Sequence, residues 1–294
     1  MTETVLILGG QGRFARHAAL AFADAGWQVR HAGRGDDLTQ AAQGADVIVM
    51  GWNPPYQHWA AQVPGQQARV IAAARATGAT VIIPGNVYVF GPDAGPVWGS
   101  DTPHRAENPL GRVRIAMEQA WRDSGVQVIV LRCGDYLDDA PSGNGFDRML
   151  VPALAKGVLR YPGRTDAAHA WAFLPDATRA AVLLAEMRRT LPDFADIPFP
   201  GYTLTGAELA QALMTARGRP LRLMPYPWWQ LRLLRPFMPI LGGVMEMRYL
   251  WDTPHRLSDQ PFRSLLPGFA TTPLHDALRA ATAHLCSTST QISA

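Results

Sequence analysis

The feature that most constrains the fold of this chain is its N-terminal stretch, where a glycine-rich turn joins a buried strand to a helix. Residues 5–8 are four consecutive apolar residues, and Gly9 and Gly12 follow them ahead of a segment rich in small and apolar residues. Such a turn aims backbone N–H groups and the positive end of a helix at one point, which suits a pyrophosphate. The spacing Gly9-x-x-Gly12-x-x-Ala15 differs from G-x-G-x-x-G, and a glycine turn without a ligand is the alternative.

Strand and helix patterns alternate after this turn. Short apolar runs predict strands after Gly26, at residues 46–51, from residue 81 and at 126–132, and helical patterns fall at 67–77, 109–124 and 173–184. This alternation indicates a parallel sheet with helices on both faces. We expect an α/β protein with a doubly wound Rossmann domain over residues 1–190, in which the loop 136–165 contributes to a substrate cleft. A smaller, mostly helical lobe over residues 191–294 would cover the substrate.

Composition favours a soluble enzyme. The formal net charge of +3 comes almost entirely from arginine, since Lys156 is the only lysine, and the charges are dispersed rather than arranged in a stripe that would indicate nucleic acid. Cys133 and Cys286 lie far apart without metal-ligand spacing, and no secretory leader is evident. We therefore expect a cytoplasmic protein without a metal site.

The segment from Trp228 to Leu250 is strongly apolar. Arg232, Arg235 and Glu246 interrupt it, together with two prolines, so a transmembrane span is not expected. A hydrophobic lid or a pair of core helices is the expected structure. The alternative is an interaction surface for another subunit or for a membrane.

Arginines near the expected second strand bear on the choice of dinucleotide. In dinucleotide-binding folds an acid at the end of this strand binds the ribose hydroxyls, whereas an arginine there pairs with the 2′-phosphate of NADP. Arg34 and Arg30 are the candidates, and Arg13 in the glycine turn could reach the same phosphate. The sequence thus favours NADP over NAD, with solvated surface arginines as the alternative. The remaining cofactor-binding candidates are the turn residues Gly9, Gly12, Phe14 and Ala15, with Gly51 at the end of the third strand.

Several motifs together resemble the extended branch of the short-chain dehydrogenase/reductase superfamily, which comprises NAD(P)-dependent sugar epimerases, dehydratases and reductase-like proteins. Besides the glycine turn, the resemblance rests on segments spread over most of the chain: Asn86-Val87-Tyr88-Val89-Phe90-Gly91, Asn108-Pro109-Leu110-Gly111-Arg112-Val113-Arg114, Arg132-Cys133-Gly134-Asp135-Tyr136 and Pro175-Asp176-Ala177. It implies a Rossmann fold and a nicotinamide cofactor. It also implies a possible homodimer through the helices near 67–77 and 109–124.

The catalytic residues of that family are replaced here. In the family a serine or threonine binds the reacting carbonyl or hydroxyl, a tyrosine transfers the proton, and a lysine four residues later holds the ribose and lowers the tyrosine pKa. Aligning the motifs places Asn86, Leu110 and Arg114 at these three positions. Since Pro152 stands four residues before Lys156, the chain contains no Tyr-x-x-x-Lys motif. The sequence resembles an atypical member of the superfamily.

Other residues could take over the chemistry. Asn86 and Tyr88 are two apart on a segment expected to be extended, so both side chains should point to one face. Asn86 could then orient a carbonyl, Tyr88 supply a hydroxyl, and Arg114 bind the ribose or phosphate as a fixed cation. The alternatives are a packed aromatic ring for Tyr88 and a solvated helix face for Arg114.

Loops at the carboxyl ends of the strands supply the expected substrate contacts, because ligands bind there in parallel sheets. The sequence predicts an NADP-dependent oxidoreductase or epimerase-like enzyme that acts on a small carbonyl or hydroxyl substrate. A catalytically inactive NADP-binding sensor or interaction protein is the alternative. The residues expected to contact substrate are Trp52, Asn53, Tyr56, Asp135, Tyr136 and His169.

Overall fold

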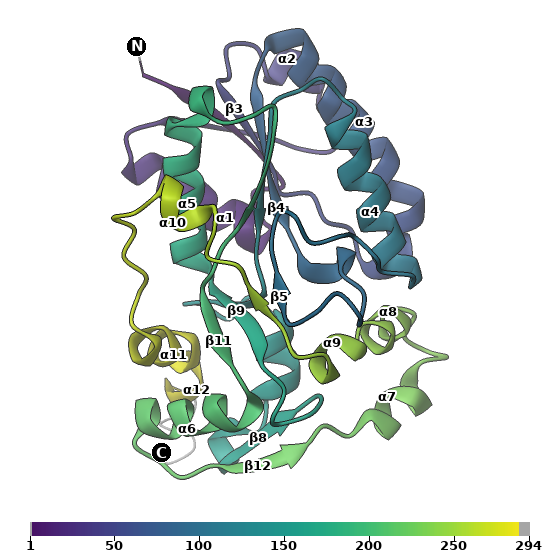
Figure 1. Cartoon of the computed structure of the whole chain (residues 1–294), viewed down its shortest axis with the longest axis vertical. Helices are drawn as coiled ribbons and strands as arrows, with labels where there is room; N and C mark the ends of the chain where they lie inside the picture. The colour runs from purple at the N-terminus through teal and green to yellow at the C-terminus, as the bar shows by residue number, and fades with distance from the viewer. Residues whose placement is uncertain (1, 288–294) are drawn as a thin grey trace.

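A parallel sheet forms the centre of the computed structural model, which describes residues 2–287 (Figure 1). Within those residues the sheet has six strands in the order β10-β6-β4-β3-β1-β2, and all its neighbours pair in parallel. The chain reverses direction across the sheet between β1 and β3, so the carboxyl ends of these strands form the crevice where ligands bind in such folds. The expected doubly wound α/β fold is confirmed. The strands are β1 (Thr4–Leu8), β2 (Gln28–Ala32), β3 (Val47–Met50), β4 (Thr80–Gly85), β6 (Val128–Arg132) and β10 (Phe194–Pro198).

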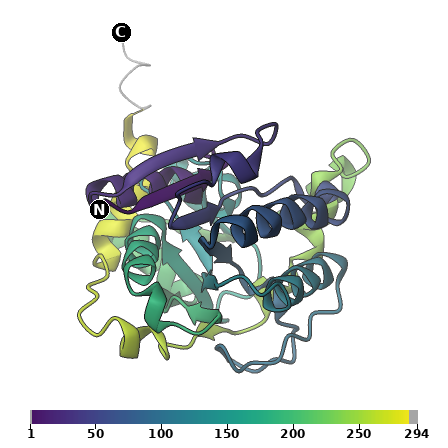
Figure 2. The ribbon, with the colours of Figure 1, turned by 90° about the horizontal axis from the view of Figure 1, so that it is seen from above.

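Helices cover both faces of this sheet. The helices α1 (Arg13–Asp24) and α5 (Leu174–Glu186) pack on one face, and α3 (Trp59–Thr77) and α4 (Pro109–Arg122) pack on the other (Figure 2). Successive residues of a strand serve the two faces in turn: Val5 and Ile7 pack with α1 and α5, whereas Leu6 and Leu8 pack toward α3 and α4. Burial on both faces explains the uninterrupted apolar run that opens the chain.

The helix α3 is longer than its sequence pattern predicted. It begins at Trp59 rather than near Gln67 and contains Pro64 in its interior. Pro64 and Gly65 disfavour a helix locally, but Trp59 and Val63 are buried against the sheet and hold the first turns in place. Burial of these two side chains outweighs the local propensity.

Smaller sheets lie beyond the carboxyl ends of the main strands. The segment at residues 134–136, expected as a loop, contributes β7 to a three-stranded sheet in the order β11-β9-β7. The strand β10 lies C-terminal to the expected domain boundary at residue 190 and yet belongs to the main sheet. The short strands are β5 (Val97–Trp98), β7 (Asp135–Leu137), β8 (Val158–Tyr161), β9 (His169–Phe173), β11 (Tyr202–Leu204), β12 (Arg222–Pro225) and β13 (Arg256–Leu257).

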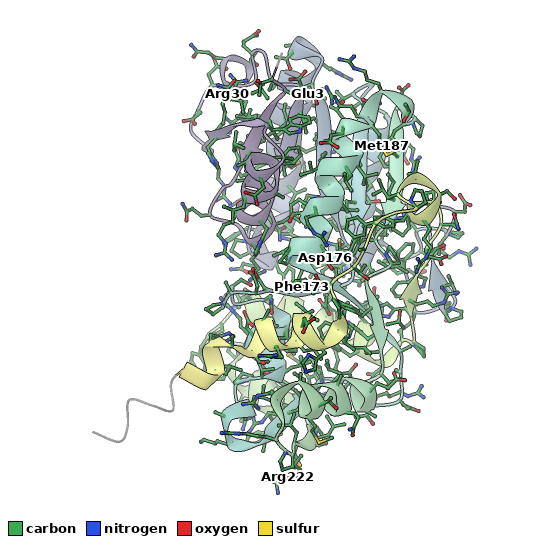
Figure 3. The ribbon with its side chains drawn as sticks, turned by 90° about the vertical axis from the view of Figure 1, so that its left-hand side faces the viewer. Glu3, Arg30, Phe173, Asp176, Met187 and Arg222 are labelled. Carbon is green, nitrogen blue, oxygen red and sulfur yellow. The ribbon has the colours of Figure 1, made fainter. Side chains whose placement is uncertain are left out.

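A third core lies between these small sheets and two helices, α6 (Gly206–Arg217) and α11 (Leu274–Thr282). Thr205 and Glu208 form a capping box at the start of α6. Figure 3 shows Phe173 and Asp176 at the start of α5, where the main sheet meets this part of the molecule, and Arg222 at the far end. The remaining short helices are α2 (Leu38–Ala41), α10 (Phe262–Leu265), α12 (His284–Ser287), η1 (Tyr56–His58), η2 (Val87–Val89), η3 (Phe146–Leu150), η4 (Leu154–Lys156) and η5 (Arg188–Thr190).

The apolar segment near residues 228–250 forms three short helices. The expectation of a core helix pair is wrong for the first of them, because most of its apolar side chains are exposed. The second and third pack against the rest of the molecule through Met247 and Leu250. No helix among residues 2–287 is both long and apolar enough to cross a membrane. These helices are α7 (Trp228–Leu234), α8 (Ile240–Glu246) and α9 (Tyr249–Asp252).

Candidate active site

The glycine turn has the geometry of an anion cradle. Gly9 has a φ of +75°, which favours glycine, and the Gly12 N–H donates to the Gly9 carbonyl over 2.7 Å. The helix α1 starts directly after Gly12, with no side chain capping its first N–H groups and no acidic residue in its first turn. These N–H groups and the helix dipole are therefore available to a phosphate oxygen.

Close packing fixes this cradle against the sheet. A Cβ atom at Gly51 would lie 2.5 Å from the Leu8 carbonyl oxygen and 2.6 Å from the Ala15 Cβ, so only glycine fits there. The Phe14 side chain is buried in the core, which leaves its backbone rather than its ring at the cradle. Trp52 is buried against Gly9, where a Cβ would meet its ring at 2.8 Å. Trp52 therefore supports the turn.

The three candidate arginines differ in what they bind. Arg13 donates from Nε and Nη2 to the carbonyls of Ser142 and Gly143, at 2.9 and 2.7 Å, and so ties the turn to the loop after β7. Arg30 donates to the Gln43 carbonyl over 2.8 Å. Arg34 is exposed, and its guanidinium makes no hydrogen bond within residues 2–287. Of the three guanidinium groups, that of Arg34 is the one without a hydrogen bond among the described residues.

Two further side chains at the end of β2 were not selected from the sequence. The His31 ring packs on Gly10, where a Cβ would lie 2.8 Å from its Nδ1 atom. The Asp36 carboxylate accepts a hydrogen bond from the Gly33 N–H over 2.7 Å. The Asp36 carboxylate therefore shares the turn after β2 with Arg34.

A polar and aromatic cluster lies at the carboxyl ends of β3 and β4. The hydroxyls of Tyr56 and Tyr88 are hydrogen-bonded at 2.6 Å. Arg114 on α4 donates from Nη2 to Asn53 Oδ1 over 2.8 Å, and its guanidinium carbon lies 4.0 Å from the centroid of the Trp59 ring. The structure thus brings together residues that the sequence placed in three separate motifs, and it adds Trp59 to them.

The local geometry of Asn86 and Tyr88 differs from the extended segment that was expected. Residues 87–89 form the 3₁₀ turn η2, and Asn86 Oδ1 accepts the Tyr88 backbone N–H over 3.0 Å. Asparagine forms this kind of turn readily, because its side chain bonds the backbone two residues on. The prediction of an extended strand was therefore wrong here. The Asn86 Nδ2 group makes no hydrogen bond within the described part of the chain.

The two tyrosines are held in their protonated form. Burial raises the pKa of Tyr88 well above its ordinary value, and the neighbouring Tyr56 and Asp135 raise it further, whereas Arg114 opposes the shift. Burial likewise raises the pKa of Tyr56. Burial also lowers the pKa of Arg114, although a guanidinium stays charged at neutral pH. The cluster therefore combines a fixed cation with hydroxyl donors rather than with a phenolate.

Three of the expected substrate residues lie on the neighbouring strands β7 and β9. The His169 Nε2 atom lies 2.8 Å from Asp135 Oδ2, and the His169 ring stacks on Trp251 with 4.2 Å between centroids. Burial raises the pKa of Tyr136 well above its ordinary value, and it raises that of Cys133 to about 12. Cys133 is therefore a neutral thiol and no nucleophile at neutral pH.

Leu110, at the position of the family tyrosine, is a buried side chain at the start of α4. Glu246 of α8 reaches this helix start: its Oε1 atom accepts the Leu110 N–H over 2.6 Å and the Asn108 Nδ2 over 2.7 Å. No other side chain caps α4 within residues 2–287. Glu246 therefore caps the helix that carries Arg114, from a segment 136 residues away in sequence.

A buried ionic network around Arg132 adjoins the polar and aromatic cluster through Asn86. Arg132, at the end of β6, is fully buried and donates to both carboxylates of Glu118 and Asp196 and to the Asn86 carbonyl. Burial lowers the pKa of the Arg132 guanidinium, but the two carboxylates outweigh it and raise the pKa above its ordinary value. An arginine closing an apolar strand is the one sequence signal that could have located this network.

Among residues 2–287, two groups of side chains have the composition of a metal site. His104, Glu118 and Asp196 form one, but Arg132 already occupies the space between the two carboxylates. The other is formed by His17, Asp138 and Asp139, with Arg16 Nη2 3.7 Å from Asp138. A guanidinium beside each group supplies the positive charge that a metal ion would bring.

The order of the parallel strands, the glycine cradle and the helices on both faces define a doubly wound Rossmann fold. No protein-family model matches the sequence, and no curated protein matches it. Solved structures match over nearly the whole chain at low identity. They include MoeE5 in complex with UDP-glucose and NAD, with a TM-score of 0.75, 15% identity, and coverage of 97% of this chain and 99% of that one.

Two further similar structures are those of bacterial enzymes. A nucleoside-diphosphate-sugar epimerase from Pseudomonas aeruginosa matches with a TM-score of 0.73 and 17% identity, over 98% of this chain and 99% of the other. A GalE-like L-threonine dehydrogenase from Cupriavidus necator matches with a TM-score of 0.73 and 18% identity, over 97% and 100% of the two chains. Similarity at this level of identity shows the fold.

Proposed function

We propose that the protein is a nicotinamide-dinucleotide-dependent oxidoreductase or epimerase-like enzyme that acts on a small carbonyl or hydroxyl substrate. The observation that carries this proposal is the Tyr56–Tyr88 hydroxyl pair beside Arg114, at the ligand-binding edge of a sheet that also bears an uncapped glycine cradle. Solved structures of the same fold include complexes with NAD, which supports a nicotinamide cofactor. When bound, such a cofactor would supply or accept the hydride.

In this proposal Tyr88 takes the role of the missing family tyrosine. Its raised pKa keeps the hydroxyl protonated, so it donates a proton to a carbonyl oxygen as hydride arrives, which favours reduction over oxidation. The free Asn86 Nδ2 group donates a second hydrogen bond to that oxygen, and Arg114 stabilises the negative charge that develops there. Tyr56 shares its proton with the Tyr88 phenolate across their 2.6 Å hydrogen bond, and a proton taken up from water then restores the pair.

Our proposal includes a preference for NADP over NAD. Arg34 has a free guanidinium at the end of β2, where the 2′-phosphate of NADP would lie, and His31 adjoins the cradle beside it. Asp36 is the competing group, since a carboxylate in this turn would favour the ribose hydroxyls of NAD. Titration with NADPH and NADH should show tighter binding of NADPH, and Arg34→Ala should reduce that preference about tenfold. Equal affinities in the unsubstituted protein would refute it.

The catalytic role is tested by a screen of carbonyl substrates followed through NADPH absorbance, with Tyr88→Phe as the key variant. Loss of the proton donor should lower kcat about 10²–10⁴-fold without changing NADPH affinity. Tyr226→Phe is the matched control, since its hydroxyl makes no hydrogen bond within residues 2–287 and it lies on the segment before α7. Because the Tyr88 pKa is raised, kcat should stay constant as the pH rises from neutral to about 10.

The same experiments distinguish an enzyme from a protein that only binds the dinucleotide. If the protein binds NADPH but turns over no carbonyl compound, and Tyr88→Phe changes nothing, the alternative of an inactive NADP-binding sensor replaces this proposal. The buried Leu110 at the family tyrosine position is the observation that favours that alternative. If neither dinucleotide binds, both proposals fail.

A further inference from the structure

The helix α7 and the loop that follows it expose large apolar side chains to solvent. Trp229, Leu233 and Phe237 are 62%, 66% and 81% exposed. Trp229 and Leu233 are four residues apart on α7 and so share one side of the helix, and Phe237 lies in the turn that follows. Leu234 and Met238 add to the same surface. We call residues 228–239 the apolar arm. In Figure 1 the chain between α7 and α8 forms the outermost point on its side of the molecule.

The apolar arm is fixed in this orientation by its first residue. Trp228 is buried, donates from Nε1 to the Pro162 carbonyl over 2.7 Å, and stacks against the Arg248 guanidinium at 5.2 Å. Trp228 therefore anchors the start of α7 to the rest of the molecule, while Trp229 and Leu233 on the same helix are exposed.

The charged side chains of the apolar arm itself have one sign. Residues 228–239 contain no Asp or Glu, whereas Arg232 and Arg235 lie on the arm. Within residues 2–287, neither Arg232 nor Arg235 forms an ion pair. Figure 3 places Arg222 at the outer end of the molecule. A partner that covers this surface should therefore offer both apolar groups and negative charge.

We propose that the apolar arm docks the protein on the surface of an anionic phospholipid bilayer. Trp229, Leu233 and Phe237 enter the boundary between headgroups and acyl chains, and Arg232 and Arg235 bind the lipid phosphates. Tryptophan and arginine suit this boundary, since each has an apolar body and a polar end. A second copy of the chain fits less well, because a two-fold contact between two arms would oppose their arginines.

Docking at this position would place the membrane next to the candidate active site. The helix α8 continues from the arm, and Tyr56 packs so closely on Gly243 that a Cβ there would meet the tyrosine ring at 2.7 Å. Glu246 then joins α8 to the start of α4. The docking surface and the Tyr56–Tyr88 pair are thus consecutive parts of one packed unit, whatever reaction the site performs.

The test is co-sedimentation of the full chain with vesicles of phosphatidylcholine alone and of phosphatidylcholine mixed with phosphatidylglycerol. Binding should require phosphatidylglycerol and weaken as salt is raised. Trp229→Ser/Phe237→Ser and Arg232→Gln/Arg235→Gln should each lower the vesicle partition coefficient about tenfold or more. The matched controls are Leu20→Ser and Arg189→Gln/Arg279→Gln, which remove exposed side chains of the same kinds elsewhere and should leave binding unchanged.

Gel filtration of the same variants tests whether a second copy of the chain covers the apolar arm instead. If the unsubstituted chain is a dimer that Trp229→Ser/Phe237→Ser converts to a monomer, a second copy covers the arm and the membrane proposal is refuted. It is also refuted if the protein binds neither kind of vesicle, or if the arm variants and the controls bind equally. Circular dichroism of each variant confirms that it is folded.

Discussion

The two halves of the ligand-binding edge are built in different ways. Around β1 and α1 the backbone makes the site, because Gly9, Gly12 and Gly51 shape a cradle whose donors are main-chain N–H groups. Around β4 and α4 side chains make it, because Tyr88 and Arg114 carry the polar groups. The first half retains the pattern of the family that the sequence resembles, and the second half departs from it.

Packing explains why the two halves can differ in this way. A side chain at Gly51 would collide with the Leu8 carbonyl and with Ala15, so the backbone half tolerates little change without moving α1. At Leu110 the side chain is buried in the core, and Glu246 binds only the backbone N–H, so that hydrogen bond does not depend on which side chain stands there. The side chains of this half are therefore easier to exchange than the glycines of the cradle.

Replacing Arg132, in the half built from side chains, should cause the largest loss of unfolding free energy. Arg132→Met leaves Glu118 and Asp196 buried without their cation, and loss of one partner of a buried ion pair costs about 3–5 kcal/mol. Urea unfolding measures this loss. Arg112→Met on the exposed side of α4 is the control and should stay within about 0.5 kcal/mol. Equal midpoints for the two variants would show that the network does not stabilise this half.

The backbone half is tested by adding one methyl group. Gly51→Ala places a Cβ within 2.5 Å of a backbone oxygen, which should destabilise the protein by about 3 kcal/mol and weaken dinucleotide binding as α1 shifts. Gly65→Ala in α3 is the matched control, because no atom lies within 4 Å of its Cβ, and it should stabilise the helix by up to about 1 kcal/mol. Unchanged stability and binding in Gly51→Ala would contradict the close fit.

The difference between the halves also determines how much the sequence could reveal. Five strands of the main sheet, their order along the chain and the cradle follow from apolar runs and glycine spacing, which are local, and all of them are present in the structure, whereas β10 was not predicted. The sequence also selected Tyr56, Tyr88 and Arg114, which the structure brings together. Their roles stay a prediction.

Contacts between distant segments could not be predicted. Nothing in the sequence links Glu246 to Leu110, since such a pair forms only when the apolar segment folds back onto α4. The turn at Asn86 depends on a single side-chain hydrogen bond that competes with the strand pattern. The early start of α3 depends on burial of Trp59, which outweighs the propensities of Pro64 and Gly65.

The stability of the protein should depend on pH through His255. His255 stacks on Trp98 and contacts His169, and burial and the neighbouring His169 lower the pKa of His255 to about 3. The unfolded chain takes up a proton below about pH 6.5 while the folded one does not, so this contribution is present above that pH and declines as the pH falls toward 3.

The expected slope is ~1.4 kcal/mol per pH unit below about 6.5, because one proton separates the two states. His255→Phe keeps an aromatic ring against Trp98 but cannot titrate, so its unfolding free energy should fall less steeply by that amount. Urea unfolding at several pH values measures both slopes. Parallel slopes for the two proteins would mean that His255 is protonated in the folded state.

The smallest expected change in stability comes from Glu246, which joins α8 to the start of α4. Glu246→Gln keeps an oxygen for the Leu110 N–H but removes the negative charge at the start of α4, which is worth about 0.3–1 kcal/mol. Glu107→Gln, on an exposed residue just before α4, is the matched control and should have less effect. If Glu246→Gln also lowers kcat while Glu107→Gln does not, the position of Arg114 depends on this cap. The active half is then held in place from α8, through a single carboxylate, and not by the sheet alone.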